Sequence, residues 1–414
     1  MAHRFLLAPC LLVATLWLLA ACGGEAEAPS PTATAGSAAR TVSPSPVAAS
    51  PTPGAPAGAA TPLPLASSPA PASPTPASAA PPPRATPAAP PAPEVELPEG
   101  FAAFLAAGDL SSPTSLAVDA EGRVYVSEVG GTVWRLRDED GDGVFEARDR
   151  FVSVAPRITG IALAPDGALY VSHTGRVTAA RDLSGDGAAE DVREVVVGLP
   201  NGRHQNNGLA FGPDGLLYLT NGSTCNDCQE ADGRSAAILR LSAEGTGLEV
   251  FARGLRNPYD LTFTPDGRLW ATDNGSDPPC NTIDELNLIV EGGDYGWPYS
   301  PGCDAFARGI PPVADLGFNT SSDGLVYYDA GAFPAEYRGS FFVAQFGANS
   351  GDPNIAKRVV AVKVEETADG PRGEVTDFAL GLDNPLDVVV DRDGSLLIAD
   401  FGSGKVYRIV YVGG

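Results

Sequence analysis

Basic residues are scarce in this chain of 414 residues. Only 27 Lys and Arg stand against 51 Asp and Glu, so the formal net charge is −24. Binding to nucleic acid needs basic surface, and this balance argues against such a partner. An acidic surface suits divalent cations, although ordinary solubility explains it more simply.

Histidine is rarer still, with His3, His173 and His204 as the only three. Imidazole is the usual side chain that accepts a proton near neutral pH, so each position matters. His173 ends a predicted strand in "YVSHTGRV" and is best explained as a structural histidine. His204 lies in "GRHQNNGLAFGPDGLLY", where five polar residues precede a predicted strand. Its position suits a catalytic base or a structural histidine equally.

A long apolar run occurs only at the start of the chain. Residues 1–22, "MAHRFLLAPCLLVATLWLLAAC", place His3 and Arg4 before apolar residues and end in Leu-Ala-Ala-Cys. This pattern predicts a secretion signal with a lipobox, so that Cys22 becomes the lipidated first residue. A transmembrane anchor is the alternative, but the run is short for one. We therefore expect an extracytoplasmic, membrane-anchored lipoprotein.

Aromatic residues are absent from residues 23–94, which consist mainly of Ala, Pro, Thr and Ser. Such a composition buries too little apolar surface to fold and predicts a disordered, semi-extended tether. The folded part is expected to span residues 95–414, which is enough for one large domain.

Cysteine is also sparse. Cys10 leaves with the signal, and four cysteines remain besides Cys22. An even number in an exported protein predicts two disulfides, for which we expect the pairs Cys225–Cys228 and Cys280–Cys303 among three possible pairings. "CNDC" alone also suits zinc or redox chemistry, but no second CxxC accompanies it.

Stretches with helical periodicity are nearly missing, whereas one phrase of strand, glycine turn and strand recurs. Its copies lie at residues 117–127, 162–172, 210–220, 262–272 and 389–399, with a degenerate copy at 335–345. A period of roughly 40–50 residues predicts an all-β, six-bladed β-propeller. Residues 101–107 and 405–411 are expected to complete one blade together. The regular period disfavours a β-sandwich.

Polar residues that precede inner strands of a propeller face its central site. His204 holds such a place, and Arg256 and Asn257 in "GLRNPYDLTFTPDG" hold it one blade later. An arginine there stabilises developing negative charge or forms a salt bridge.

Acidic residues are concentrated in residues 272–298, "TDNGSDPPCNTIDELNLIVEGGDYGWP". Ca²⁺ takes six to eight oxygen ligands, and this stretch offers carbonyls around Gly275 and four carboxylates, those of Asp273, Asp277, Asp284 and Glu285. Residues 138–149 and 182–193 have acids at EF-hand-like offsets. Because no flanking helices are apparent, we interpret both as polar hairpin turns rather than Ca²⁺ sites.

Together these stretches resemble the glucose/sorbosone dehydrogenase family, the soluble quinoprotein sugar dehydrogenases. The match "GLRNPYDLTFTPDGRLWATDNG…DELNLIVEGGDYGWP" is specific, and "HQNNGLAFGPDGLLYLTNG" is a second anchor. The resemblance implies a propeller that binds pyrroloquinoline quinone (PQQ) and Ca²⁺ and oxidises a hydroxyl of a sugar or related polyol. The electron acceptor is not implied.

The resemblance also implies roles for single residues. His204 would be the general base, with hydride transfer to the quinone, and Arg256 would stabilise the oxyanion. Cofactor contacts would come from Gln205, Asn221, Asn257, Lys357 and Arg358. The Ca²⁺ stretch of the family covers Gly275, Ser276, Asp284, Glu285 and Tyr295.

Three positions depart from the family pattern. Asn221-Gly222-Ser223 replaces an acidic residue, Ile158 and Thr159 stand where an amide is frequent, and Asn384 stands where an arginine is common. PQQ carries three carboxylates, so a lost cation weakens its binding. A non-catalytic cell-surface binding module and a Ca²⁺-dependent lactonase or hydrolase therefore remain alternatives.

Overall fold

The computed structural model describes residues 89–278, 280–298, 309–347 and 357–413. Within these ranges it contains 24 strands and no α-helix, which confirms the all-β prediction. In the same ranges no helix is long and apolar enough to cross a membrane. The predicted signal with Cys22 and nearly all of the tether lie outside the described residues.

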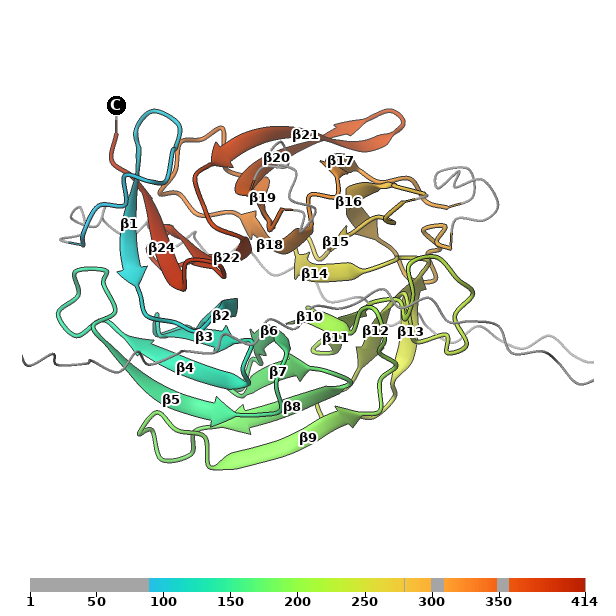
Figure 1. Ribbon diagram of the computed structural model, residues 1–414, viewed down its shortest axis with the longest axis horizontal. Coiled ribbons are helices and arrows are strands. Elements are labelled where there is room, and N and C mark those ends of the chain that lie inside the picture. Colours follow the sequence, from blue (N-terminus) through green and yellow to red (C-terminus); the bar gives the residue numbers. More distant parts are fainter. Residues whose placement is uncertain (1–88, 279, 299–308, 348–356, 414) are drawn as a thin grey trace, which may run out of the picture. The chain divides into compact units, whose positions relative to one another are not determined.

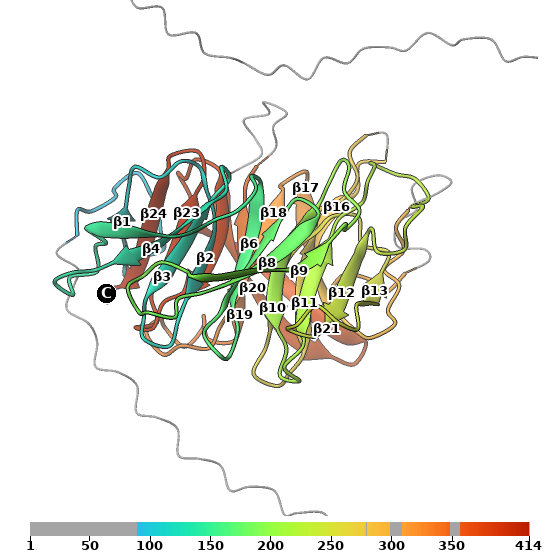
Figure 2. The same ribbon diagram turned by 90° about the horizontal axis from the view of Figure 1, so that it is seen from below.

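The strands form six antiparallel sheets of four strands each, arranged as blades around one axis (Figures 1 and 2). The predicted six-bladed propeller is confirmed. Blade by blade from the inner strand outward, the first three sheets are β2 (Pro113–Val118), β3 (Val124–Glu128), β4 (Thr132–Arg137), β5 (Ala147–Ser153); β6 (Ile158–Leu163), β7 (Leu169–His173), β8 (Arg176–Arg181), β9 (Asp191–Val197); and β10 (Asn206–Phe211), β11 (Leu217–Asn221), β12 (Ala237–Leu241), β13 (Glu249–Arg253).

The last three sheets follow the same order from the axis outward. They are β14 (Pro258–Phe263), β15 (Leu269–Asp273), β16 (Ile283–Ile289), β17 (Ala314–Phe318); β18 (Ser322–Tyr328), β19 (Ser340–Gln345), β20 (Arg358–Thr367), β21 (Gly370–Ala379); and β22 (Pro385–Val390), β23 (Leu396–Asp400), β24 (Lys405–Tyr411), β1 (Phe101–Ala107).

The ring closes as the sequence predicts, because β1 pairs with β24 and completes the blade of the C-terminal strands. Before β1 the chain already packs against this blade, where Pro91 forms a bridge to Phe104 of β1, and against the preceding blade. Ala92 and Val95 are buried, and Glu96 forms a bridge to Leu380 at the end of β21. Residues from 89 on, the first that the structure describes, thus pack against the propeller ahead of the predicted boundary at 95.

The repeated phrase of the sequence forms the turn between the first and second strand of each blade. Its glycines adopt positive φ, a conformation that other residues adopt only at a cost. The six positions are Gly122 (82°), Gly167 (83°), Gly215 (78°), Gly267 (84°), Gly339 (80°) and Gly394 (84°). The degenerate copy at 335–345 thus belongs to the repeat.

At three of the six blade boundaries, a side chain on one inner strand forms a hydrogen bond to the backbone of the next inner strand. The backbone N–H of Leu325 donates to Asp260 Oδ2 (2.9 Å), and that of Leu116 donates to Asp387 Oδ2 (2.7 Å). Ser115 Oγ accepts from the N–H of Ile161 (3.2 Å) in the same way. These acceptors satisfy backbone donors at the blade boundaries.

Glycines hold the same position on the other three inner strands. A Cβ atom on Gly160, Gly208 or Gly324 would lie 2.5–2.8 Å from backbone atoms of the following inner strand. Three of the six inner strands therefore meet the next blade through a hydrogen-bonded side chain, and the other three through direct backbone approach at a glycine. This packing fixes the residues that precede each inner strand, and these residues form one end of the propeller, here called the His204 face.

Candidate active site

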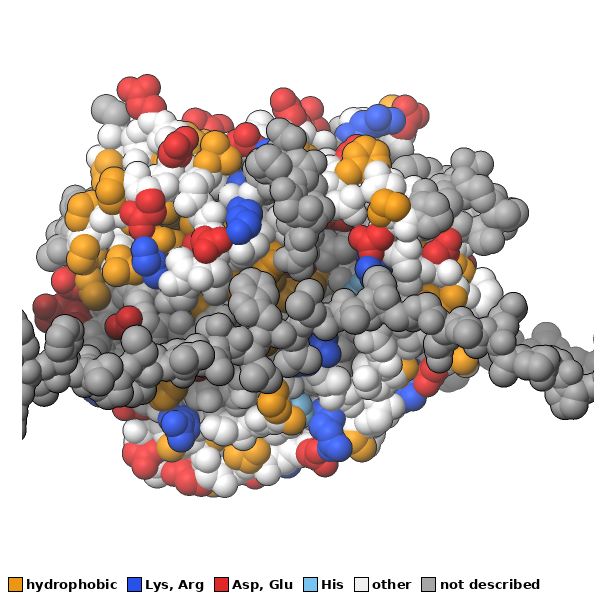
Figure 3. All heavy atoms as spheres, viewed as in Figure 1, with side chains coloured by type: hydrophobic (Ala, Val, Ile, Leu, Met, Phe, Trp, Pro, Cys, Tyr) orange, Lys and Arg blue, Asp and Glu red, His pale blue; other side chains and the backbone are white. Residues whose placement is uncertain are grey.

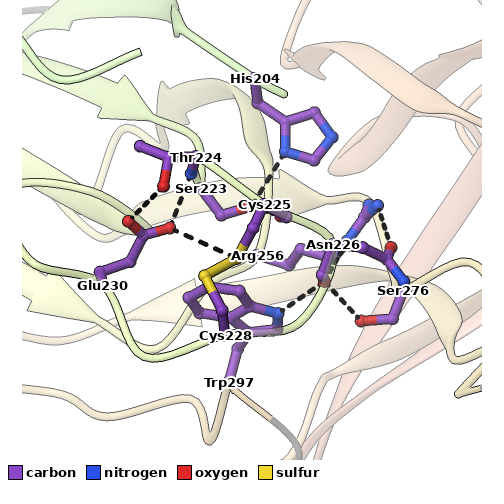
Figure 4. Close-up of a disulfide and its surroundings, with 10 residues drawn as sticks. All are labelled: His204, Ser223, Thr224, Cys225, Asn226, Cys228, Glu230, Arg256, Ser276 and Trp297. Carbon is purple, nitrogen blue, oxygen red and sulfur yellow. Dashed lines mark hydrogen bonds between the residues drawn. A yellow bond between two sulfur atoms is a disulfide. The ribbon is translucent and has the colours of Figure 1, made fainter. Parts of the chain in front are cut away.

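The polar residues before β10 and β14 meet the ends of β11 and β15 on the His204 face (Figure 4). Backbone hydrogen bonds extend the sheets beyond the strands. The N–H of His204 donates to Ser223 O (3.0 Å), and the N–H of Ser223 donates to Arg256 O (2.8 Å). The structure thus brings His204 and Arg256, predicted from separate motifs, to the same place.

His204 has one ring nitrogen bound and one available. Nδ1 lies 2.9 Å from Ser223 Oγ, and Ser223 Oγ itself donates to Cys225 O (2.7 Å). A hydroxyl has a single proton, so Ser223 Oγ must accept from Nδ1–H, which leaves the lone pair on Nε2. Among the described residues Nε2 has no hydrogen-bond partner.

The electrostatic surroundings keep this imidazole neutral. Burial first, and then the positive charges of Arg256 and Arg203, lower the pKa of His204 to about 3. Loss of solvation and like charge both disfavour the imidazolium ion. A neutral imidazole with a free Nε2 has the correct form for a general base.

Asn257 lies beside His204, with Gly222 between them. A Cβ atom on Gly222 would lie 2.6 Å from both Asn257 Oδ1 and His204 Cβ, so the close approach requires glycine. Asn257 Oδ1 accepts from Asn207 Nδ2 (3.0 Å). Asn257 Nδ2 has no hydrogen-bond partner among the residues described and remains available as a donor next to the imidazole.

Arg256 is oriented into the protein and is only 3% exposed. Its Nη1 donates to the carbonyls of Asn274 (3.2 Å) and Gly275 (2.6 Å), and its Nη2 donates to Asn226 Oδ1 (2.7 Å) and Asp277 (3.1 Å). Nε donates to Asn226 O (3.1 Å). All five donors are used within the chain, so this geometry supports the salt-bridge alternative rather than oxyanion stabilisation.

The predicted disulfide between Cys225 and Cys228 is confirmed, and it closes the loop that covers Arg256 (Figure 4). Within it, the backbone oxygen of Asn226 accepts from Arg256, from Ser276 Oγ (3.3 Å) and from Trp297 Nε1 (3.3 Å). The loop therefore has a structural role in the site. Cys303 lies outside the described residues, so the Cys280–Cys303 pair stays a prediction.

Two predicted cofactor contacts have their side chains engaged elsewhere. Gln205 Nε2 donates to Arg157 O (2.9 Å), and Gln205 Oε1 accepts from Thr174 Oγ1 (2.7 Å). Asn221 is fully buried and donates to Arg234 O (2.8 Å). Both side chains support neighbouring loops and do not present donors to a ligand.

The predicted cations near β20 divide into two cases. Arg358 lies along the blade, where its Nε donates to Gln345 Oε1 (2.7 Å). Lys357 reaches the residues before β22 and donates to Asp383 Oδ1 (2.7 Å) and Asn384 Oδ1 (2.8 Å). Only Lys357 is thus placed near the His204 face, and it is paired with an acid.

One cation was missed in the sequence. Arg157 stands three residues before Gly160, as Gln205 and Asn257 stand three residues before their own link positions. It is exposed and forms no ion pair with a described residue. Its spacing from Gly160 in the repeat is the sequence signal that marks it.

Among the described residues, the acids predicted to bind Ca²⁺ are not a group of three whose ligand oxygens lie within 4.8 Å of one another, although Asp273, Asp284 and Glu285 are close enough to act on one another electrostatically. Asp284, which is 1% exposed, accepts from Gly275 N (2.9 Å), Thr320 Oγ1 (2.7 Å) and Ser322 N (3.3 Å). Tyr295 Oη donates to Leu288 O (2.6 Å) inside the blade. Both side chains are thus engaged in hydrogen bonds within the chain.

The remaining acids of that set are also engaged within the chain. Glu285 is buried against Asn287, and burial together with Asp273 raises its pKa to about 8. Asp273 accepts from the backbone N–H groups of Arg256 (2.9 Å) and Asn257 (2.7 Å) and so fixes the loop before β14. Of the predicted metal ligands, the backbone at Gly275 and Ser276 is what lies at the His204 face.

In each acidic hairpin the first aspartate accepts from backbone N–H groups of the turn, and ligand oxygens of the acidic side chains lie within 4.8 Å of one another, so the interpretation as polar turns rather than Ca²⁺ sites stays a prediction. Asp138 accepts from the N–H groups of Gly141 (2.7 Å) and Gly143 (2.9 Å), and Asp182 accepts equivalently from Gly185 and Gly187.

His173 is buried with Nε2 2.9 Å from Thr178 Oγ1, as a structural histidine would be. The face shown in Figure 3 carries acidic and basic side chains interspersed.

The fold and the His204 face define a six-bladed propeller of the class found in soluble sugar dehydrogenases, which confirms the resemblance. A family model described as "Domain of unknown function (DUF7133)" matches residues 91–407, and the chain belongs to that family.

Similar structures and relatives carry sugar dehydrogenase names. A putative oxidoreductase (glucose dehydrogenase) of Thermus thermophilus is 25% identical, with a TM-score of 0.61 over 75% of this chain and 100% of that one. The PQQ-bound aldose sugar dehydrogenase of Streptomyces coelicolor is 22% identical, with a TM-score of 0.59 over 78% and 99%. The latter similarity concerns the fold alone.

Among curated relatives, quinoprotein glucose dehydrogenase B of Acinetobacter calcoaceticus is 46% identical over 57 residues, which is 14% of this chain and 11% of that protein. The chain spans about half or less of the length of the curated relatives that it matches. The matched share of three of these relatives is 53%, 11% and 47%.

Proposed function

We propose that this protein oxidises a hydroxyl group of a sugar or related polyol with PQQ as cofactor. The single observation that carries the proposal is the state of His204, a neutral imidazole with Nε2 free, beside the free amide of Asn257. The sugar dehydrogenase names of the similar proteins support the same chemistry. Bound PQQ would supply the acceptor for the hydride and its two electrons.

The chain's own contribution to the reaction is the proton transfer. His204 Nε2 accepts the proton of the substrate hydroxyl, and the Nδ1–H held by Ser223 keeps the ring oriented. Because its pKa is lowered to about 3, the imidazole is in its basic form throughout the neutral range. The same low pKa makes it a weak base for a hydroxyl proton.

The described residues fit a cofactor with several carboxylates. Arg157 is an exposed cation without an ionic partner among them, Lys357 reaches the same face, and Asn257 Nδ2 is a free donor. Charge-assisted hydrogen bonds from such groups bind carboxylates strongly. We propose these three residues as the cofactor contacts, in place of Gln205, Asn221 and Arg358.

The fit to Ca²⁺ is poorer. The carboxylates of Asp284 and Glu285 are buried in structural hydrogen bonds, and the Gly275 carbonyl accepts from Arg256. Any Ca²⁺ here would rest on the backbone carbonyls at Gly275 and Ser276 together with oxygens of a ligand and water. We therefore derive no step through the metal.

The test is a titration of PQQ into the purified full chain with and without Ca²⁺. Binding is read from the cofactor's absorbance, and turnover from dye reduction with a panel of aldoses. We expect binding and turnover in the wild type, and binding without turnover in His204→Gln. Absence of binding would favour the surface binding module, and lactone hydrolysis without quinone would favour the hydrolase.

The location remains a proposal from the sequence. We propose that Cys22 is lipidated and anchors the mature protein on the outer side of a membrane. Mass spectrometry of the mature N-terminus tests this, and a chain that retains residues 1–21 would contradict it.

A further inference from the structure

We propose that Ser223 is the positioning residue of His204, and that the Cys225–Cys228 disulfide holds Ser223 in this role. The inference rests on the proposed function of His204 as a base. It concerns a residue that the sequence motifs did not identify, because Asn221-Gly222-Ser223 stands where the family resemblance predicts an acidic residue.

The first step is the direction of the hydrogen bonds. Ser223 Oγ is buried, lies 2.7 Å from Cys225 O and 2.9 Å from His204 Nδ1. Cys225 O can only accept, so it takes the one hydroxyl proton and Oγ must accept from Nδ1–H. The tautomer of His204 is therefore set by a backbone carbonyl two residues beyond Ser223.

The second step is the fixation of that carbonyl. Cys225 belongs to a ring closed by the disulfide to Cys228, with a Cα–Cα distance of 6.1 Å. On one side of it, Thr224 donates through N (2.6 Å) and Oγ1 (2.7 Å) to Glu230. On the other side Asn226 contacts Arg256, Ser276 and Trp297 (Figure 4).

The third step is the difference between a serine and a carboxylate at this place. A carboxylate would attract the imidazolium ion and raise the pKa of His204. The neutral hydroxyl orients the ring without adding charge, and Arg256 and Arg203 remain the charges that act on it. Ser223 thus fixes the Nε2 lone pair, while the imidazole stays neutral over a wide pH range.

The experiment combines imidazole ¹⁵N NMR of the full chain with steady-state kinetics. The variants are Ser223→Ala and, with the hydroxyl retained, Ser223→Thr. Ser235→Ala is the matched control, since Ser235 is equally buried in the same β11–β12 connection but its Oγ has no hydrogen-bond partner. His204→Gln assigns the His204 signals.

We expect the wild type and Ser235→Ala to show His204 protonated at Nδ1. In Ser223→Ala the population should shift toward the Nε2–H form, and kcat should fall about tenfold with KM nearly unchanged, as loss of one orienting hydrogen bond implies. Ser223→Thr should restore the Nδ1–H form. A double Cys225→Ser, Cys228→Ser variant should give a smaller shift in the same direction.

A Ser223→Ala protein that keeps the Nδ1–H form would overturn the inference, and so would a Ser223→Thr protein that fails to restore it when its thermal melt matches that of the wild type. The NMR result does not depend on turnover. If the tautomer shifts as expected but even the wild type oxidises no sugar, the proposed function fails while the positioning of His204 by Ser223 stands.

Discussion

His204 and Asn257 lie close together on either side of Gly222. A Cβ atom on Gly222 would stand 2.6 Å from His204 Cβ and 2.6 Å from Asn257 Oδ1. The two residues come from the segments before β10 and β14, 53 positions apart in the sequence, and Gly222 lets them approach each other closely. The spacing between His204, the proposed base, and Asn257, a proposed cofactor contact, therefore depends on the lack of a side chain at Gly222.

The first prediction follows from this spacing. Gly222→Ala should push His204 and Asn257 apart, because a methyl group cannot fit at 2.6 Å from either. We expect turnover to fall by about 10²-fold, as small misplacements of catalytic groups do, and stability by about 1–3 kcal/mol. Gly233→Ala is the control, since nothing lies within 4 Å of its Cβ position. Equal activity of both variants would contradict the prediction.

The second prediction concerns the pH dependence of the base. Burial lowers the pKa of His204 to about 3, and a lowered pKa means that the imidazole loses its proton already well below neutral pH. The pH profile of kcat/KM should therefore show no inflection near 6.5 from this residue. A profile with its acid limb near 6.5 that disappears in His204→Gln would show that the site stabilises the imidazolium ion.

The third prediction separates structural acids from metal ligands. Asp284→Asn replaces one acceptor oxygen by an NH₂ group, which faces either the Gly275 N–H at Oδ1 or the Thr320 and Ser322 donors at Oδ2. We expect the free energy of unfolding to fall by about 2–3 kcal/mol, with Ca²⁺ stoichiometry unchanged in calorimetry. Glu291→Gln, which affects only an exposed ion pair with Arg240, is the control. A loss of Ca²⁺ binding with unchanged stability would restore Asp284 as a ligand.

The fourth prediction tests the cation that the sequence analysis missed. Arg157→Gln should weaken binding of the tri-carboxylate cofactor about tenfold and reduce its salt dependence, because one charge-assisted contact is lost. Arg372→Gln is the control, since Arg372 is also exposed but lies on β21 at the outside of a blade. An equal effect of both variants would mean that Arg157 acts only through the overall charge.

The sequence predicted those features that depend on local pattern. The period of the glycine turns predicted the blades, and the polar residues before inner strands predicted where His204 and Arg256 lie. The directions of the side chains were not predictable in this way. Arg256 is oriented by Asn226, 30 positions away, and Tyr295 by a hydrogen bond to Leu288 O within its own blade. Neither orientation can be predicted from the adjacent residues in the sequence.

For the same reason, the positions of the acidic residues around the axis were only partly predictable. The sequence concentrated them in residues 272–298, whereas the structure also places Asp260, Asp323 and Asp387 on three inner strands around the axis. Asp260 and Asp387 serve as links between blades, which a sequence without register does not reveal. Structural links of this kind explain why acids from several blades need not indicate a hydrolase metal centre.

The last prediction follows from the Asp260 link. Burial, and secondarily the charge of Asp387, raises the pKa of Asp260 to about 8, against 3.8 in an exposed aspartate. The folded state thus binds the proton more tightly than the unfolded state, so the stabilisation is complete at low pH and is lost as the pH rises toward 8. Between pH 6.5 and 8.5 we expect the free energy of unfolding in urea to fall by about 1–2 kcal/mol.

Asp260→Asn keeps an acceptor for the Leu325 N–H but cannot ionise, so it should flatten this slope and exceed the wild type in stability at pH 8.5. His173 and His204, whose pKa values are lowered from 6.5, act in the opposite sense at the lower end of this window, because the unfolded imidazoles still bind protons at pH 6.5. Their contribution is common to the wild type and Asp260→Asn, so a slope that persists unchanged in Asp260→Asn would assign the effect to other buried acids such as Glu285.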